Sequence, residues 1–322
     1  MNNFIFSINA TLPIFLVIVI GYILKICGKV NEAFCSAAND INYKLTLPAL
    51  LFIDISSTNI KESFDTKYVL YCAIVTTVCF VVIWVLAKIF IKDKTEIGAF
   101  VQGSFRGSAA VLGVAFIQNM YGSASMAPLM IIGAVPIYNI CSVIVLTFEG
   151  SNNNDGRTGD GRNNGKNIKK AFINICKNPI ILSIIAGIAV SLLEIDFPVI
   201  IDKTLENVAK LATPLALLVI GASFEGRKAI AKIRITLVGC FIKLVVQPAI
   251  FLPVALWLGF EGEKLISILI MLGAPTTASC YIMAKAMNND TVLTSSIVVM
   301  STLLSAVTLT LWIFLLRSVG VC

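Results

Sequence analysis

Lys44-Leu45-Thr46-Leu47-Pro48 is repeated later in the chain as Lys210-Leu211-Ala212-Thr213-Pro214, so the two prolines lie 166 residues apart (214 − 48). The same offset aligns further helix-breaking residues without a gap: Pro13 with Pro179, Gly21 with Gly187, and Gly107 with Gly273. Repeated prolines and glycines are stronger evidence for a duplication than repeated leucines, which apolar composition alone would align. An internal duplication in a hydrophobic chain is typical of a secondary transporter.

The composition is that of a membrane protein. Hydrophobic residues make up 57% of the 322 residues and charged residues 13%, whereas a soluble domain usually carries about 25% charged residues. The first ten residues lack the basic start of a cleavable signal peptide, so we expect the first apolar segment to remain as a membrane span. The nine cysteines show no metal-ligand spacing, and we predict neither a metal site nor a cofactor.

The predicted fold class is an all-α membrane protein whose ten transmembrane helices form two inverted five-helix repeats, with helices four and nine broken and crossing. A span needs about 20 mostly apolar residues, and the ten predicted spans are roughly 4–26, 36–56, 67–91, 96–119, 125–148, 171–195, 199–224, 233–259, 264–286 and 292–316. The second, fourth, seventh and ninth are weak by hydropathy, yet the duplication is clearest there. This combination is expected of discontinuous helices at a transport site.

The predicted domains are residues 1–150 for the first repeat, 151–170 for a flexible cytoplasmic linker, and 171–322 for the second repeat. The linker is rich in Asn, Gly and Asp, which cannot bury apolar surface; a regulatory site is the alternative interpretation. With both termini outside, the loops expected in the cytoplasm hold 16 Lys and Arg residues and the outer loops five. This asymmetry predicts a multi-pass cell-membrane protein with both termini outside, and it accounts for the net charge of +7 without nucleic-acid binding.

Arg106 is the candidate residue for binding a substrate. It lies about ten residues into the fourth span, or ~15 Å along a helix, near the middle of the membrane, where a cation is costly and usually functional. Gly107 and Ser108 follow it and allow close approach. We predict that the guanidinium binds a substrate carboxylate. The alternative is that Arg106 bonds a backbone carbonyl of a broken helix and never contacts substrate.

The corresponding segment of the second half is Gly273-Ala274-Pro275-Thr276-Thr277. Pro275 removes a helical N–H and frees backbone groups, which in a bilayer must be satisfied internally or line a cavity. We therefore predict that Pro275, Thr276 and Thr277 line the substrate site. The alternative is a kinked, tightly packed helix whose hydroxyls bond to their own backbone.

The remaining predicted positions are one polar residue and four helix-breaking prolines. Asn139 in the fifth span is predicted to contact the ligand, with a helix–helix hydrogen bond as the alternative. Pro48, Pro136, Pro214 and Pro275 are predicted to break their helices.

The residues that are absent also limit the function. The chain has no histidine, which excludes a histidine proton relay and a serine–histidine pair, and we predict no catalytic residue and no enzyme. Asp54 and Glu149 lie near the ends of predicted spans, and the scarcity of intramembrane acids favours an anionic substrate over a cation.

Three motifs resemble the auxin efflux carrier family, which includes plant PIN-formed auxin exporters and bacterial malate and malonate permeases. They are Leu47-Pro48-Ala49-Leu50-Leu51-Phe52, Phe105-Arg106-Gly107-Ser108 with Leu112-Gly113, and Ala284-Lys285 with Asn288 and Leu293-Thr294-Ser295. Ser108 replaces the family's usual asparagine, and Ala115 stands where a proline is common, so the fourth helix is expected to be less sharply broken than the ninth. The resemblance covers essentially the whole chain and implies a scaffold domain, a transport domain and elevator-type alternating access.

The predicted function is secondary transport of small organic acid anions, either dicarboxylates or aromatic carboxylates. A sodium-coupled organic anion symporter of the bile-acid type and a membrane ligand sensor without transport remain alternatives. The expected partners are the organic anion and the lipid bilayer. The oligomeric state, monomer or homodimer, is left open.

Overall fold

The computed structural model describes residues 2–57, 65–109, 117–118, 120–121, 126–151 and 175–321, and these ranges contain helices but no β-strand. The predicted linker, apart from residue 151, lies outside the described residues. So does Ala115, so the expected difference in sharpness between the two helix breaks is not tested.

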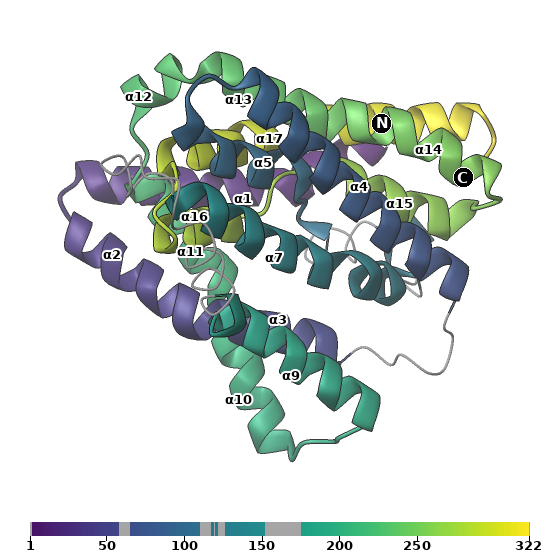
Figure 1. The fold of residues 1–322 in the computed structure, drawn as a ribbon, viewed down its shortest axis with the longest axis horizontal. Helices are drawn as coiled ribbons and strands as arrows, with labels where there is room; N and C mark the ends of the chain where they lie inside the picture. The colour runs from purple at the N-terminus through teal and green to yellow at the C-terminus, as the bar shows by residue number, and fades with distance from the viewer. Residues whose placement is uncertain are drawn as a thin grey trace, which may run out of the picture.

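The helices follow one another as two sets along the chain (Figure 1). The first set is α1 (Asn2–Ile26), α2 (Glu32–Ile41), α3 (Leu47–Ser56), α4 (Thr66–Phe90), α5 (Ile97–Phe105) and α7 (Ala127–Ser151). The second set is α9 (Pro179–Leu193), α10 (Val199–Lys210), α11 (Ala212–Ala222), α12 (Gly226–Ala231), α13 (Ile233–Phe241), α14 (Gln247–Trp257), α15 (Gly262–Gly273), α16 (Ser279–Ala286) and α17 (Thr291–Ser318). The short elements are the π-helical turns η1 (Asn42–Thr46) and η3 (Ile242–Val246), and the 3₁₀ turn η2 (Lys94–Glu96).

The outer surface of the bundle is apolar, as a lipid-facing surface must be. Five stretches of the described chain are helical, long and apolar enough to cross a membrane: Thr66–Phe90, Ala127–Gly150, Val199–Ala222, Ile233–Trp257 and Thr291–Ser318. Exposed Leu, Ile and Val side chains recur every three or four residues on α4 (Leu70, Ile74, Val78, Val81 and Val85). Such a stripe would be costly in water and is favourable against acyl chains. The protein is therefore a multi-pass membrane protein.

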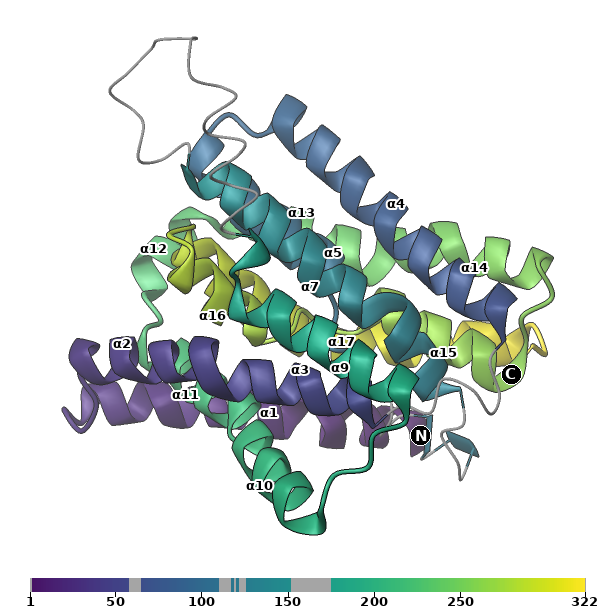
Figure 2. The ribbon, with the colours of Figure 1, turned by 60° about the horizontal axis from the view of Figure 1, so that its bottom comes forward.

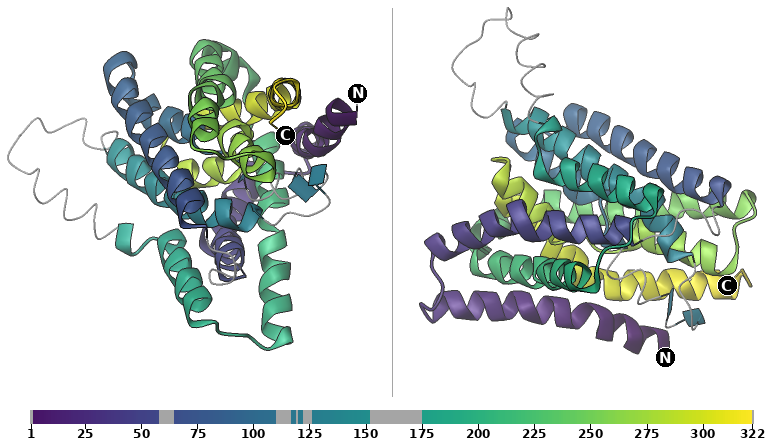
Figure 3. Two further views of the ribbon diagram at one scale, coloured as in Figure 1. Left: turned by 90° about the vertical axis from the view of Figure 1, so that its right-hand side faces the viewer. Right: turned by 90° about the horizontal axis from the view of Figure 1, so that it is seen from below.

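Two groups of helices lie on opposite sides of the molecule. α1 packs along α11 and α3 packs along α9, whereas α4 packs against α5 and α7. Figures 2 and 3 show α1, α2 and α3 on one side and α4 and α14 on the other. The N- and C-terminal ends lie at the same end of the bundle in all of these views.

Glycines let α1 and α9 approach the backbones of their partner helices. A Cβ added at Gly21 of α1 would lie 2.3 Å from the carbonyl oxygen of Leu218 in α11, and one at Gly187 of α9 would lie 3.1 Å from that of Phe52 in α3. Across the first of these contacts, a Cβ at Gly221 would lie 1.9 Å from the carbonyl oxygen of Ile18. Only glycine permits helix axes this close.

The prolines predicted to break their helices disturb the backbone to different degrees, and at Pro48 and Pro214 the helix is irregular but continues. Pro48 lies in the first turn of α3, directly after η1, and Pro214 follows the junction of α10 and α11 at Leu211. In both cases the irregular turn includes or borders the carbonyl four residues earlier, which the proline cannot bond. At Pro136, by contrast, α7 continues as one helix, so the break expected there is wrong. A proline costs one hydrogen bond, and packing of the surrounding helix can compensate for it.

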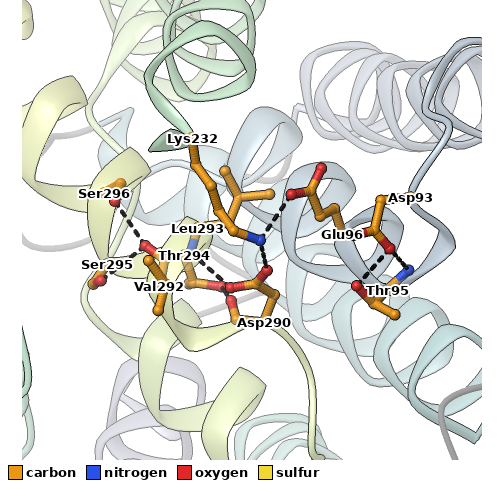
Figure 4. A network of polar contacts seen from close by, with 10 residues as sticks. All are labelled: Asp93, Thr95, Glu96, Lys232, Asp290, Val292, Leu293, Thr294, Ser295 and Ser296. Carbon is orange, nitrogen blue, oxygen red and sulfur yellow. Dashed lines mark hydrogen bonds and ion pairs between the residues drawn. The ribbon is translucent and has the colours of Figure 1, made fainter. Parts of the chain in front are cut away.

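At the other end of the bundle from the termini, an ion cluster ties three helix starts together (Figure 4). Lys232, which precedes α13, donates to Glu96 Oε1 at 2.7 Å before α5 and also to Asp290, the N-cap of α17. Burial alone would lower the pKa of Lys232, but its hydrogen bonds with Asp290 and Glu96 raise it above the ordinary lysine value. The cluster fixes the first half of a broken helix, α5, relative to α13 and α17.

Candidate substrate site at the helix crossing

The fourth and ninth predicted spans are both interrupted part-way along their length. α5 ends at Phe105 and residues 106–108 are not helical; α15 ends at Gly273, and α16 begins only at Ser279. The two interruptions touch each other, because the N–H of Ser108 donates to the carbonyl oxygen of Pro275 at 2.8 Å. The two broken helices are therefore in contact at their breaks, and we call this contact the crossing.

Three carbonyls freed by the break in α5 each accept a hydrogen bond from a side chain elsewhere in the chain. In a continuous helix these carbonyls would accept from residues 107 to 109. Instead, Gly103 O accepts from Thr276 Oγ1 at 2.7 Å, Ser104 O from Gln247 Nε2 at 2.6 Å, and Phe105 O from Lys243 Nζ at 3.2 Å. The polar side chains near the crossing thus satisfy backbone groups that lipid could not.

The break in α15 is satisfied in the same way. Met271 O would accept from residue 275 in a helix, but Pro275 has no N–H. It accepts instead from Lys243 Nζ at 3.1 Å and from Tyr138 Oη at 2.8 Å. Lys243, fully buried on η3, therefore places one ammonium between the carboxyl ends of two half-helices, where the helix dipole favours a cation.

Gly107 is required by this arrangement. A Cβ at that position would lie 2.9 Å from Lys243 Nζ and 3.2 Å from Met271 O. Any larger residue would push the ammonium away from the carbonyls that it joins. The group that approaches Gly107 closely, as predicted, is thus the side chain of Lys243.

Arg106 is 4% exposed and is held by two uncharged groups. Its guanidinium donates to Ser279 Oγ at 2.8 Å and lies 2.8 Å from Met283 Sδ on α16. Among the described residues it forms no ion pair. A buried guanidinium that forms no ion pair within the described ranges can bind an anion.

A cavity of about 50 Å³ opens onto Arg106. One wall comes from the crossing and α7, and includes Gly107, Ser108, Asn139, Thr277 and Ser279. The other wall comes from α3 and α11, and includes Leu47, Leu50, Leu51, Asp54, Ala212 and Thr213. Sites for drug-sized ligands measure about 300–1,000 Å³, so this cavity suits a ligand of few atoms.

Asn139 is one of the residues that line this cavity, and its side chain has an unused acceptor. Its Nδ2 donates to Val135 O one turn earlier, at 2.8 Å. Its Oδ1 is buried without a hydrogen-bond partner among the described residues. Since buried polar atoms are nearly always paired in native proteins, a ligand donor or water is expected there.

The structure separates the predicted site residues into two groups. Arg106, Gly107, Ser108, Asn139 and Thr277 line the cavity, whereas Pro275 and Thr276 hold the crossing together and do not line it. The hydroxyl of Thr276 is used by Gly103 O, and its N–H donates to Ser301 Oγ at 3.0 Å.

Two charged residues of the site were not assigned from the sequence. Lys243 lies ten residues into the predicted span 233–259, so the criterion applied to Arg106 would have found it. Asp54 was placed near a span end, but it lines the same cavity as Arg106. Distance along a span gives depth only and does not reveal which face of the helix borders a cavity.

Residues 6–313 match a protein family described as membrane transport protein. The chain belongs to this family, that of the auxin efflux carriers. It is 26% identical over 319 residues to the uncharacterized transporter YfdV of Escherichia coli K12, covering 98% of this chain and 99% of that protein. It is 25% identical over 316 residues to a putative malonate transporter of Rhizobium meliloti, covering 95% of each chain. The family match extends over both helix breaks, and the protein is a membrane transporter.

Proposed function

We propose that this transporter carries small organic acid anions and binds them in the cavity at Arg106. The observation that carries the proposal is the buried guanidinium, held by neutral partners and facing a small cavity. The unpaired Oδ1 of Asn139 adds a second polar contact that suits a hydroxyl, an amide or a protonated carboxyl. The putative malonate transporter among the relatives supports a small dicarboxylate as the first compound to test.

The proposed fold is the inverted repeat of ten spans. In this fold, helices of each half contact helices of the other half at equivalent positions. Residues 21 and 52 of the first half correspond, at the offset of 166, to residues 187 and 218 of the second. Gly21 meets Leu218, and Gly187 meets Phe52. A pseudo-two-fold axis generates such reciprocal pairs, which supports the duplication inferred from the prolines.

The proposed mechanism is alternating access of the elevator type. The cavity lies between two sets of helices, with α3 and α11 on one side and the crossing on the other. The ion cluster at Lys232 and the side-chain bonds at the crossing link α5, α13 and α17 into one body. We propose that this body slides past α3 and α11, exposing the cavity alternately to the two sides.

The sodium-coupled alternative is less well supported. Sodium sites in transporters of this kind use the carbonyls at the ends of half-helices. Here Phe105 O and Met271 O already bind the ammonium of Lys243, which leaves these carbonyls without room for a metal cation.

The test is a binding screen followed by counterflow. Purified protein is heated with malonate, malate, succinate or indole-3-acetate, and with uncharged malonamide as the matched control. We expect at least one acid, and not malonamide, to raise the melting temperature, because a bound ligand stabilises the folded state. Accumulation of the labelled acid by counterflow in proteoliposomes then separates a transporter from a sensor without transport. Stabilisation by malonamide and malonate alike would contradict an anion site.

We also propose that both termini face outward. Cys27 is exposed and directly follows the end of α1, and Figure 1 shows that α1 runs from the end of the bundle that holds the termini to the opposite end. In a background with the other cysteines replaced, Ser318→Cys should react with an impermeant maleimide added to intact cells, and Cys27 should not. The reverse pattern would invert the orientation.

A further inference from the structure

A second and larger space lies between α4 and the stretch formed by α13, η3 and α14, and it shares no lining residue with the cavity described above. We call it the α4–α14 groove; its volume is about 1170 Å³. The elements that border it lie next to each other in the left view of Figure 3, α4 in blue and α13 to α14 in green. Exposed apolar side chains form its walls, among them Val82, Leu86 and Phe90 of α4 and Val238 and Ile250 of the other side. In a membrane protein such a groove is open to acyl chains.

The α4–α14 groove has about the depth of one membrane leaflet. At one end it is bordered by Phe251, whose carbonyl oxygen accepts a hydrogen bond from Tyr71 Oη of α4 at 2.5 Å. From there α4 lines the groove from Val78 to Phe90, a rise of 12 residues (90 − 78), or ~18 Å of helix. The hydrocarbon of one leaflet is about 15 Å thick, half of the whole core. The groove thus suits a chain that enters from one leaflet and stops near the middle of the membrane.

Charged residues line the other end of the groove, beyond Phe90: they are Lys92, Asp93, Glu96 and Arg234. Both acids already have donors, as Figure 4 shows. Glu96 Oε1 accepts from Lys232, and Asp93 Oδ1 accepts from the N–H and the hydroxyl of Thr95. Lys92 and Arg234 are exposed, and within the described ranges neither forms an ion pair. The groove therefore combines a long apolar floor with two cations at its mouth.

We propose that the α4–α14 groove binds one anionic phospholipid, with an acyl chain along the groove and the phosphate at Lys92 and Arg234. A guanidinium pairs with a phosphate through two parallel hydrogen bonds, and basic residues at a membrane surface attract anionic lipids. A soluble phosphate compound would leave the apolar walls unused. A transmembrane helix of another protein would cross both leaflets, whereas the groove extends over one.

The bound chain would pack directly behind the crossing. Gln247 lines the α4–α14 groove, and its Nε2 donates to Ser104 O, one of the carbonyls freed by the break in α5. An acyl chain in the groove shields this hydrogen bond from water and fills the space between α4 and α14. Because a ligand that binds the folded state stabilises it, we expect the phospholipid to raise the melting temperature of the protein.

The first experiment uses the unaltered protein, delipidated in detergent. Phosphatidylglycerol, phosphatidylcholine with the same acyl chains, or glycerol 3-phosphate is added, and binding is measured by native mass spectrometry and by the melting temperature. We expect one tightly bound phosphatidylglycerol, with an affinity roughly 10-fold above that of phosphatidylcholine. Equal binding of the two lipids would overturn the role of the cations, and equal stabilisation by glycerol 3-phosphate would show a site for soluble phosphate instead.

The second experiment locates the headgroup with the double variant Lys92→Gln/Arg234→Gln. We expect it to bind phosphatidylglycerol no better than phosphatidylcholine. The matched control is Arg227→Gln/Lys228→Gln, which removes two charges from α12, outside the groove, and should keep the preference. A preference that survives in the first double variant would overturn the headgroup site.

The third experiment locates the acyl chain by filling the groove. Val238→Trp places a large side chain in the α4–α14 groove, whereas Leu237→Trp adds one at an exposed position of the same helix that does not line the groove. We expect only Val238→Trp to lose the bound phosphatidylglycerol. Retention of the lipid in Val238→Trp would overturn the proposal. If that variant does not fold, the wild-type comparison and the charge variants still decide, and none of these measurements depends on the proposed transport function.

Discussion

The two walls of the cavity are built on different principles. The wall of α3 and α11 consists of regular helices that are held against α1 and α9 by glycine contacts with backbone. The crossing is held by side chains that replace missing helical hydrogen bonds, notably Thr276, Gln247 and Lys243. Close helix packing suits the wall that supports the fold. Polar groups that are not used within a helix suit the wall that binds the substrate. The comparison predicts that mutations in the first wall impair folding and mutations in the second impair binding or transport.

The largest effect on stability is expected from Gly221→Ala. The added Cβ would lie 1.9 Å from the carbonyl oxygen of Ile18, a backbone atom that cannot move without shifting α1. We expect a loss of about 3 kcal/mol, the upper part of the range for overpacking, seen as a lower melting temperature in detergent. Gly226→Ala is the matched control, because its Cβ would meet only Phe224, at 3.9 Å. Equal stability of the two variants would contradict close packing as the basis of this wall.

Arg106 tests the binding wall. Arg106→Ala should weaken organic anion binding by about 100-fold, or about 2.7 kcal/mol, since it removes the charge that the anion neutralises. Arg106→Lys should recover only part of this, because lysine cannot form the bidentate fork. Affinity is measured by titration, with the melting temperature of the ligand-free protein as the check on folding. Unchanged affinity in the folded alanine variant would leave Arg106 with a structural role only.

A smaller effect is expected from Thr276→Val, which keeps the shape of the side chain and removes its hydrogen bond with Gly103 O. A buried acceptor left unsatisfied costs about 1–3 kcal/mol, and we expect a value near the lower end together with slower transport. Thr77→Val is the control, because the hydroxyl of Thr77 is exposed and bonds Ala73 O of its own helix. A loss of stability in the control as large as in Thr276→Val would show that the crossing does not depend on this bond.

The smallest effect is expected outside the membrane, at the ion pair between Asp65 and Lys264, 2.6 Å apart. The hydrogen bond from Lys264 lowers the pKa of Asp65 below its ordinary value. The stabilisation is therefore complete above the unfolded pKa of about 4 and is lost as the pH falls through the lower, folded-state pKa. Asp65→Asn should cost less than about 1 kcal/mol, since the pair is partly exposed, and the difference from wild type should vanish in acid. A difference that grew on acidification would contradict the assigned sign.

The sequence predicted most of what depends on backbone chemistry. Pro275 and Gly273 predicted the break in the ninth span. Arg106 was identified because a cation within an apolar span is energetically costly and is usually functional. The sequence did not predict which side chains would satisfy the freed carbonyls, because Gln247, Lys243 and Tyr138 reach the crossing from helices distant in the chain. The place of Asp54 was missed for a related reason, since the cavity that it borders exists only after α3 and the crossing are packed together.

Arg106 is held in place by the protein's own groups, because Ser279 Oγ and Met283 Sδ both contact its guanidinium. The rotamer freedom of a long, flexible side chain is thus given up when the chain folds and not when a substrate arrives. Immobilising such a side chain costs roughly 0.5–1.5 kcal/mol when it happens on binding. A ligand of only a few atoms forms few contacts and could not easily offset that cost. Preorganisation of the arginine therefore lets a small anion bind with useful affinity through a small number of hydrogen bonds.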